Sequence, residues 1–352
     1  MAPVPHGGNV AVTGAAGFIG SWVVRLLLNK GYRVRACVRD INDKERTDFL
    51  RQMPGYCSGR LTLHSADIDN PGCFDEIFKG CHAVAHVSHV STYTDHNYVK
   101  SVCDHVINSI NQSGTVSRVV VTSSVAAVMS EMNLDELVRR PVLYEERYPD
   151  ELDPRRTVER QGYSMGKLIA EHAFAEAAEQ HGFWEAITCC PGDNVGPILA
   201  PHQKDRGPWQ RHIQEMLLGR YEQTWVYRPW NPVDVRDDAA CHVGLLESLD
   251  VRNGERYIAW STELIDVEDV CRGIDRLLPE LNFKVTEPVE VHPEKLQARE
   301  SKYRAIWAQC DLRNDRMKAV TGVSFRGFDE SLRDCVESVS YTHLTLPTKR
   351  IV

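Results

Sequence analysis

The sequence predicts an α/β fold, namely a doubly wound parallel sheet with a smaller, irregular C-terminal lobe. The first observation is a glycine turn with G-x-x-G-x-x-G spacing that follows an apolar run and precedes a helical apolar stripe. The second is the alternation of short β-branched runs with helical patterns through the first half of the chain. The third is the strongly β-branched run at 117–122, whose three consecutive valines are typical of a parallel strand covered by helices on both faces.

Composition narrows the class of protein. The chain has 352 residues, with 41 Lys and Arg against 49 Asp and Glu, so its formal charge is −8. This balance argues against a nucleic-acid partner. No apolar run approaches the ~20 residues that cross a bilayer, and the N-terminus does not resemble a secretory signal. We therefore expect a cytoplasmic protein without a membrane partner, whose 11 scattered cysteines are reduced.

The first half of the chain supplies regularly alternating elements. Periodicity of two or 3.6 residues predicts strands at 9–13, 32–38, 61–64, 83–87 and 117–122, and helices at 18–29, 43–52, about 73–78 and 97–111. A charged, less regular insertion follows at 130–153. These elements account for most of a doubly wound sheet.

The pattern loosens in the second half. It predicts helices at 162–180, 211–218, 239–248, 266–278, 314–320 and 329–339, strands at 186–189 and 256–259, and a turn-rich exit at 191–197. We divide the chain into a dinucleotide-binding domain (1–196) and a substrate-binding lobe (197–339), from which the chain could return to the sheet. Residues 340–352 lack a helical stripe and are expected to be a non-native or disordered tail.

The glycine turn suits a pyrophosphate. Gly14 permits a tight turn, Gly17 lets the backbone approach a ligand, and Gly20 lets the helix pack closely on the strand. The helix then opens at Phe18 and Ile19 with free N–H groups and the positive end of its dipole aimed at the turn. The alternative is a glycine-rich loop that binds nothing.

The residues at the C-terminal end of the second strand indicate whether NAD(H) or NADP(H) binds. In such folds an acid there favours a free ribose 2′-hydroxyl, and a base favours a 2′-phosphate. Arg39 stands at this tip, with Arg35 within the strand, and a guanidinium can grip a phosphate in two places. NADP(H) is therefore favoured, while Asp40 keeps NAD(H) open.

Two further strand ends complete the expected cofactor site. Asp67, followed by Ile68, could accept from the adenine amino group or could cap the next helix. Ser88 stands where the chain passes beneath the cofactor. Four histidines between residues 82 and 96 lack a compact ligand pattern, so we expect no metal.

Ser124, Tyr163 and Lys167 are the candidate catalytic residues. Tyr163 and Lys167 are four apart, so they project from one helix face, and Ser124 follows a strand. Because the reference pKa of tyrosine is about 10, Tyr163 needs a nearby cation, which Lys167 supplies while also holding the nicotinamide ribose. Tyr163 would then act as general acid in reduction, and Ser124 would donate to the substrate oxygen. The alternatives are a strand-end cap for Ser124 and an exposed helix pair for Tyr163 and Lys167.

These motifs resemble those of the extended short-chain dehydrogenase/reductase superfamily (the NAD-dependent epimerase/dehydratase family). The resemblance covers about residues 9–338 and is nearest to the NADPH-dependent dihydroflavonol-reductase-like and cinnamoyl-CoA-reductase-like branch. It is carried by Thr13–Val24, Tyr32–Asp40, Val121–Ser124, Tyr163 and Lys167. It implies a Rossmann-type sheet, a catalytic Ser124, an Arg39 contact to the 2′-phosphate, and Pro191 on the nicotinamide side. The loop 87–91 departs from the family pattern, as do Ser101 and Asp104.

The leading function hypothesis is an NADPH-dependent reductase of a ketone or aldehyde in a small organic molecule. A sugar-nucleotide epimerase or dehydratase that retains NAD is the second, and a non-catalytic NADP(H)-binding regulator is the third. Substrate groups are expected from 89–94, 197–209 and 221–230. Two interpretations stay open for four aromatic residues, which could line a substrate pocket or belong to the hydrophobic core: Trp209, Trp225, Tyr227 and Trp230. Monomer and homodimer both stay open.

Overall fold

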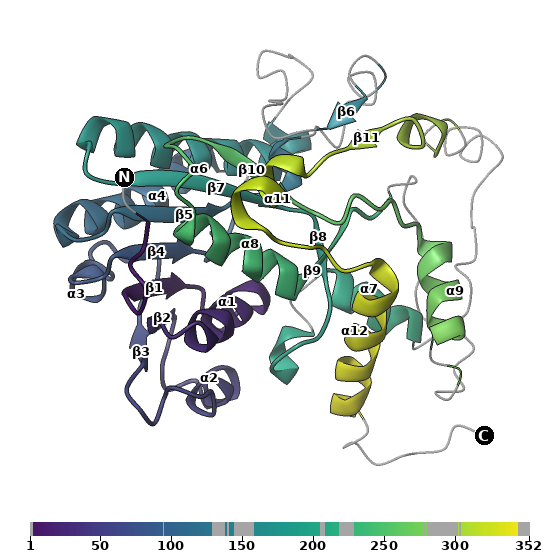
Figure 1. Cartoon of the computed structure of the whole chain (residues 1–352), viewed down its shortest axis with the longest axis horizontal. Helices are drawn as coiled ribbons and strands as arrows, with labels where there is room; N and C mark the ends of the chain where they lie inside the picture. The colour runs from purple at the N-terminus through teal and green to yellow at the C-terminus, as the bar shows by residue number, and fades with distance from the viewer. Residues whose placement is uncertain are drawn as a thin grey trace.

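A computed structural model describes residues 3–93, 95–128, 138, 141–143, 158–204, 208–217, 229–277, 279, 302 and 304–343. Its centre is a seven-stranded sheet, all parallel, in the order β10-β7-β5-β4-β1-β2-β3 (Figure 1). The strands are β1 (Asn9–Thr13), β2 (Arg33–Val38), β3 (Leu61–Ser65), β4 (Ala83–His86), β5 (Arg118–Thr122), β7 (Glu185–Pro191) and β10 (Arg256–Ala259). The predicted doubly wound Rossmann-type sheet is confirmed.

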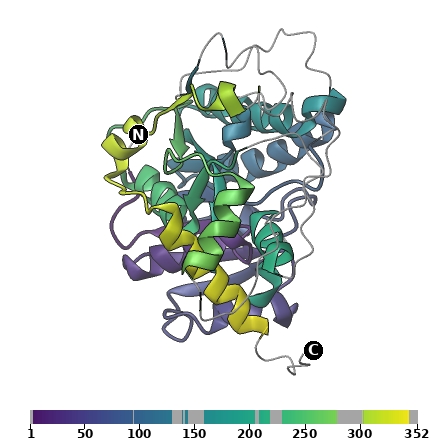
Figure 2. The same ribbon diagram turned by 90° about the vertical axis from the view of Figure 1, so that its right-hand side faces the viewer.

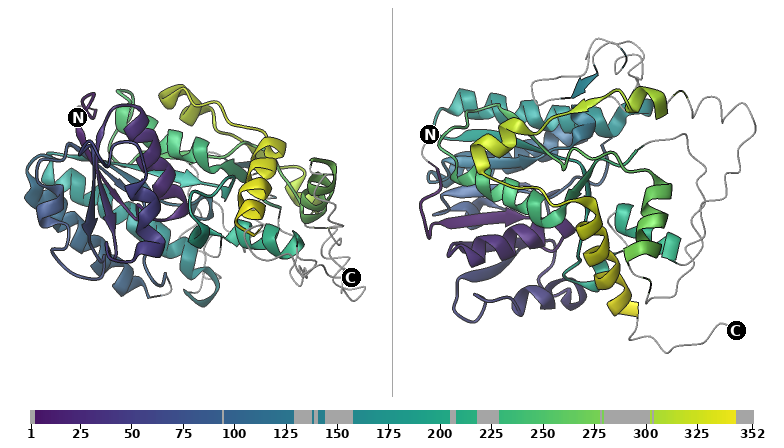
Figure 3. Two further views of the ribbon diagram at one scale, coloured as in Figure 1. Left: turned by 90° about the horizontal axis from the view of Figure 1, so that it is seen from below. Right: turned by 45° about the vertical axis from the view of Figure 1, so that its right-hand side comes forward.

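Two pairs of long helices cover the sheet. α1 (Phe18–Asn29) packs with α8 (Val235–Glu247), and α4 (His96–Ser113) packs with α6 (Val158–His181). Seen from below, the strands lie between the two helical layers (Figure 3, left). In β5, Val120 belongs to the apolar cluster under α1 and α8, whereas Val119 and Val121 belong to the cluster under α4 and α6. This alternation explains why all three central residues, Val119 to Val121, are apolar.

The order of strands places a crevice at one edge of the sheet. β1 pairs with β2 on one side and with β4 on the other, so the chain reverses its winding direction there. Ligands of open α/β sheets bind outside the carboxyl ends of the strands at such a point. The glycine turn follows β1 directly and therefore lies in this crevice. Short helices complete this half, namely α2 (Lys44–Arg51), α3 (Asp75–Phe78) and η1 (Val125–Ala127).

The C-terminal lobe has a small core of its own. It contains α7 (Pro208–Leu217), α9 (Val267–Leu277), α12 (Phe328–His343), η2 (Pro201–Gln203) and the pair β8 (Asp193–Val195) and β9 (Pro232–Asp234). Buried side chains of α7, α9 and α12 pack in one apolar cluster, and Figure 2 shows these three helices gathered on one side of the molecule.

Several boundaries differ from those that the sequence suggests. The chain does return to the sheet, because β10 pairs with β7 and α8 covers it, although both lie within 197–339. The turn-rich run 191–197 contains β8, whose partner β9 is distant in sequence. A second short pair joins β6 (Val142–Leu143), from the irregular insertion, to β11 (Asp311–Leu312), just before α11 (Asp315–Thr321). α12 continues to His343, so residues 340–343, which lack a helical stripe in the sequence, are helical; residues 344–352 lie outside the described chain.

The structure also bears on the state of the cysteines and on membrane-spanning helices. All 11 cysteines are free thiols. Among the described residues, no helix combines the length and apolar character required to span a bilayer.

Candidate active site

A cleft of about 780 Å³ opens at the carboxyl ends of the strands, between the sheet and the lobe. The turns after β1, β2, β3, β4, β5 and β7 line it, and η2 and α7 contribute from the lobe. It brings together every site residue that the sequence suggests: Gly14, Gly17, Phe18, Ile19, Gly20, Arg39, Asp67, Ile68, Ser88, Ser124, Tyr163, Lys167 and Pro191.

The glycine turn fits a diphosphate group. Gly14 has φ +66°, and a Cβ there would stand 2.9 Å from the Ser88 backbone. A Cβ on Gly20 would stand 2.3 Å from the Gly14 carbonyl oxygen, so helix and turn touch there. α1 begins after Gly17 with no side-chain cap and no acidic residue in its first turn. Its N-terminus therefore presents backbone donors and positive dipole to the cleft, which favours an anion.

The lobe is fastened to this turn by two residues that sequence analysis did not single out. Gln203 is buried, and its Nε2 donates to Ser21 Oγ (3.0 Å) and to the carbonyls of Ala16 and Gly17 (3.3 Å each). His202 Nε2 lies 2.8 Å from the Ala16 carbonyl oxygen. The residues are separated by more than 180 positions, so no local pattern reveals the contact.

At the adenosine end of the cleft, Arg39 Nε lies 3.6 Å from Asp67 Oδ2. Asp67 also accepts from the Asp69 N–H at 3.2 Å. The cap proposed for Asp67 is wrong, because α3 begins after Phe74 and has no side-chain cap. Arg46 of α2 lines the same end of the cleft and was missed.

Arg35 does not reach the cleft. Its guanidinium donates to the carbonyls of Ile77 and Lys79 at 2.6 Å each. It therefore fastens β2 to the end of α3. Of the two arginines considered for a 2′-phosphate, only Arg39 lines the cleft.

Three consecutive residues with hydroxyl groups, the last residue of β5 and the two that follow it, have different partners. Thr122 Oγ1 lies 2.7 Å from His242 Nε2 of α8. The Ser123 hydroxyl donates to the buried Glu171 carboxylate of α6. Ser124 faces the cleft and accepts from the Ala126 N–H at 3.2 Å, so it also caps η1. Since Ser123 is committed to Glu171, Ser124 is the serine available to a ligand.

Lys167 is buried beside Tyr163. Its Nζ donates to the Thr122 carbonyl at 3.0 Å and lies 5.8 Å from the centroid of the Tyr163 ring. Both residues line the cleft, but Tyr163 is 48% exposed and Lys167 is buried, so Tyr163 is the more accessible of the two. Tyr93 packs edge-on against Tyr163, with ring centroids 5.0 Å apart. Gly166 makes this possible, because a Cβ there would stand 2.7 Å from Tyr93.

Beneath the cleft, Ser88 is held by Thr13, which in turn contacts the buried His86. Thr13 Oγ1 accepts from the Ser88 N–H (3.1 Å) and Ser88 Oγ (2.8 Å), and it lies 3.0 Å from His86 Nδ1. Because Thr13 accepts from Ser88, its own proton points to His86. Burial, and then the nearby Lys167 charge, lower the pKa of His86 to about 3. His86 is therefore a neutral acceptor that orients this loop.

The substrate side of the cleft is only partly described. Trp209 lines it and lies against Trp230, with ring centroids 4.1 Å apart. Trp230 itself is buried in the lobe core. His89 and Ser91 of the segment 89–94 also line the cleft, whereas Thr94, Trp225 and Tyr227 lie outside the described residues.

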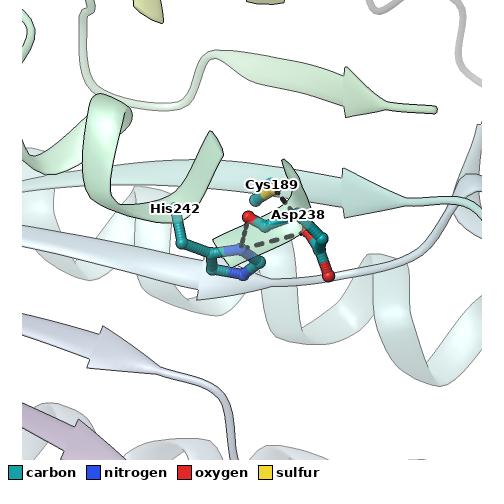
Figure 4. Close-up of side chains that lie close together, drawn as sticks. All are labelled: Cys189, Asp238 and His242. Carbon is teal, nitrogen blue, oxygen red and sulfur yellow. Dashed lines mark hydrogen bonds and ion pairs between the residues drawn. The ribbon is translucent and has the colours of Figure 1, made fainter. Parts of the chain in front are cut away.

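One group of side chains has the composition of a metal site. Within the described ranges, Cys189, Asp238 and His242 are the residues whose ligand atoms gather, all within 4.8 Å and all buried (Figure 4). Both His242 nitrogens are already engaged, Nδ1 with Asp238 and Nε2 with Thr122. A cation would have to break one of these hydrogen bonds, so we interpret the group as a polar network.

Comparisons with known proteins agree with this geometry. The model of the family "NAD dependent epimerase/dehydratase family" matches residues 10–259. Dihydroflavonol 4-reductase of Zea mays is 37% identical over 202 residues, a match that spans 55% of this chain and only 54% of that protein. Cinnamoyl-CoA reductase 1 of Petunia hybrida is 30% identical over 349 residues, 97% of this chain and 95% of that protein. The crystal structure of vestitone reductase from alfalfa (Medicago sativa) is similar with a TM-score of 0.72 and 26% identity, covering 96% of this chain and 99% of that one. The chain thus belongs to the NAD dependent epimerase/dehydratase family, in the reductase branch of the extended short-chain dehydrogenases/reductases.

Proposed function

We propose that this protein is an NADPH-dependent oxidoreductase that reduces a ketone or aldehyde of a small organic molecule to an alcohol. The observation that carries the proposal is the meeting of Ser124, Tyr163 and the buried Lys167 in the same cleft as the glycine turn. The reductase names of relatives that align over nearly the whole chain support it. They do not identify the substrate of this protein.

The proposed cofactor contacts run along the cleft. The N-terminus of α1, with the turn that ends at Gly17, would hold the diphosphate. Arg39, with Arg46 nearby, would hold the 2′-phosphate, because guanidinium groups bind phosphate oxygens in pairs. Pro191 lines the opposite end, where the nicotinamide would lie. NADPH, when bound, supplies the hydride.

The proposed catalytic roles follow from the geometry. Ser124 donates a hydrogen bond to the substrate carbonyl oxygen and thereby stabilises the negative charge that develops on it. Tyr163 gives its phenolic proton to that oxygen. Lys167 stabilises the phenolate that remains, and it has three donors, of which the Thr122 carbonyl takes one. The remaining donors are available to the ribose hydroxyls.

The test is an assay of the purified protein with NADPH and NADH against a panel of ketones and aldehydes. We expect loss of NADPH absorbance with at least one carbonyl compound, and loss of that activity in Tyr163→Phe. Identification of the cofactor released when the protein is denatured distinguishes a reductase from an epimerase or dehydratase of the same family. Tightly held NAD⁺ together with no net NADPH consumption would indicate an epimerase or dehydratase instead.

A further inference from the structure

A continuous line of hydrogen bonds runs through the sheet beneath Lys167. Lys167 Nζ of α6 donates to the Thr122 carbonyl, 3.0 Å away. Thr122 Oγ1 lies 2.7 Å from His242 Nε2 of α8. His242 Nδ1 lies 2.8 Å from the Asp238 carbonyl oxygen and 3.2 Å from Asp238 Oδ1. Figure 4 shows the two contacts of His242 with Asp238. The last residue of β5 is therefore held from both faces of the sheet.

The chemistry of the partners fixes the position of one proton on His242. Both Asp238 oxygens near Nδ1 only accept, so Nδ1 carries the proton. Nε2 then faces the Thr122 hydroxyl in either charge state of the ring. It accepts from the hydroxyl when the imidazole is neutral and donates to it when the imidazole is charged. The contact with Thr122 thus persists whichever state the ring adopts.

The sheet holds Thr122 on one side only, because Thr122 pairs with Cys189 of β7 but lies beyond the pairing with β4. β4 pairs with β5 only as far as the pair His86 and Val121, one residue before Thr122. The Thr122 carbonyl therefore lies beyond this ladder. Among the hydrogen bonds in the described part of the chain, this carbonyl is the one acceptor of Lys167 Nζ. The ammonium group also lies over the Tyr93 ring, 5.0 Å from its centroid, so the carbonyl and this ring together set its position.

The supporting pair is costly to bury. His242 and Asp238 are both 0% exposed. Burial lowers the pKa of His242, but the charge and hydrogen bonds of Asp238 outweigh burial, so the pKa is raised overall. Burial also keeps the Cys189 pKa well above its ordinary value, so this thiol lies protonated beside Asp238, with Sγ 3.7 Å from Oδ1. Apolar side chains could fill such a core position at a lower desolvation cost.

We propose that Asp238 and His242 are positioning residues, which lock Thr122 so that its carbonyl holds the Lys167 ammonium at Tyr163. This rests on the proposed function of Tyr163 and Lys167. The pair contacts neither substrate nor cofactor and acts through Thr122.

The other ionisable groups near Lys167 do not offer its ammonium group a free negative charge, so the Thr122 carbonyl can hold it. His86 of β4 is neutral, because burial and Lys167 lower its pKa to about 3. Cys103 of α4 is a thiol, since burial raises its pKa to about 12. Burial also raises the pKa of Tyr93 far above its ordinary value. Glu171, one turn further along α6, is paired with Arg256 Nε at 2.7 Å.

Substitutions at Thr122 and at His242 can each break this line of hydrogen bonds, and a second substitution at the same residue can restore it. Thr122→Val removes the hydroxyl at nearly constant shape, and Thr122→Ser returns it. His242→Asn keeps a donor near the Nδ1 position but loses contact with Thr122, whereas His242→Gln places a polar atom near the Nε2 position. Each variant is assayed for alcohol oxidation with NADP⁺ from pH 6 to 10, for NADP⁺ affinity and for thermal stability. Tyr163→Phe is the control for the proposed function.

We expect Thr122→Val and His242→Asn to reduce kcat about tenfold and to raise the pH at which oxidation is half-maximal by about half a unit or more, because a displaced ammonium stabilises the phenolate less well. NADP⁺ should bind about threefold more weakly, and Thr122→Ser and His242→Gln should recover most of each effect. The proposal is overturned if the pH midpoint and NADP⁺ affinity stay at wild-type values in Thr122→Val and His242→Asn, with activity following thermal stability alone.

Failure of the proposed function gives a different result. Full activity in Tyr163→Phe would refute the function whatever the Thr122 variants do. An inactive Tyr163→Phe, with wild-type pH profiles in Thr122→Val and His242→Asn, would refute the positioning role alone. The NADP⁺ titration requires no substrate, so it decides the positioning role even if no carbonyl compound is reduced.

Discussion

Arg39 Nε faces Asp67 Oδ2 at 3.6 Å across the adenosine end of the cleft. The two side chains are 66% and 31% exposed, so water weakens their attraction. A 2′-phosphate carries more charge than one carboxylate and offers paired oxygens to the guanidinium. Arg39 is thus well placed to exchange Asp67 for a phosphate.

Arg39→Ala should weaken the preference for NADPH. A hydrogen bond to a charged group contributes about 1.5–3 kcal/mol, so we expect kcat/KM for NADPH to fall about 10- to 100-fold. The value for NADH should change by less than about threefold, because NADH has no 2′-phosphate. Steady-state kinetics with both cofactors measures this. Arg33→Ala is the control, since Arg33 is exposed at the start of the same strand, and an unchanged NADPH preference in Arg39→Ala would contradict the assignment.

The adjacent serines should separate activity from stability. Ser124→Ala removes the proposed donor to the substrate oxygen and should reduce kcat about 10²-fold, with a small change in substrate KM. Ser123→Ala removes a donor to buried Glu171 and should lower the free energy of unfolding by roughly 1–3 kcal/mol. Kinetics and urea unfolding of both variants test the pair. The reverse result, with the larger kcat loss in Ser123→Ala, would show that the wrong serine is assigned.

Acid should destabilise the protein through His86. Its pKa is lowered from the ordinary value of 6.5 to about 3 by burial and by Lys167. Between these values the unfolded chain binds a proton that the folded chain does not, so stability falls as pH decreases below 6.5. The slope from this group is at most about 1.4 kcal/mol per pH unit.

His86→Asn keeps an acceptor for Thr13 but does not titrate. Urea unfolding at pH 7 and pH 5 should therefore show a smaller loss on acidification in this variant than in the wild type. His242 works in the opposite direction, because its raised pKa gives stability that is full below pH 6.5 and is lost as pH rises. Equal losses in wild type and His86→Asn would contradict a neutral, buried His86.

Gln203 should matter to cofactor binding although it comes from the lobe. Gln203→Ala removes the donor that Ala16, Gly17 and Ser21 share, which should loosen the turn. We expect NADP(H) to bind about three- to tenfold more weakly and the melting temperature to fall by several degrees. Fluorescence titration and thermal melts measure both, with the exposed Gln309→Ala as control. Wild-type affinity in Gln203→Ala would show that the turn holds its shape alone.

Local pattern was sufficient for the sheet and for the residues at its strand ends. β1 and α1 have the predicted bounds, because an apolar run, a glycine turn and a helical stripe are all local signals. Ser124 lies in the cleft because parallel strands bring their carboxyl ends to one edge, and Tyr163 and Lys167 reach the same cleft from one face of α6.

The failures concern contacts between distant parts of the chain. Gln203 and Arg46 reach the cleft through tertiary packing, for which periodicity gives no signal. Asp67 faces Arg39, which follows β2, so the helix cap that was one of two alternatives for Asp67 is wrong. Sequence analysis did not single out His242, because its partner Thr122 stands 120 positions earlier in the chain.

The most direct test of the account follows the hydride. The protein is incubated with NADPH dideuterated at C4 of the nicotinamide and with a carbonyl substrate from the panel, and the products are analysed by mass spectrometry and NMR. The account predicts one deuterium on the carbinol carbon of the released alcohol, one NADP⁺ formed for each alcohol, and neither product with Tyr163→Phe. Turnover without net NADPH consumption, or an alcohol without deuterium at that carbon, would contradict it.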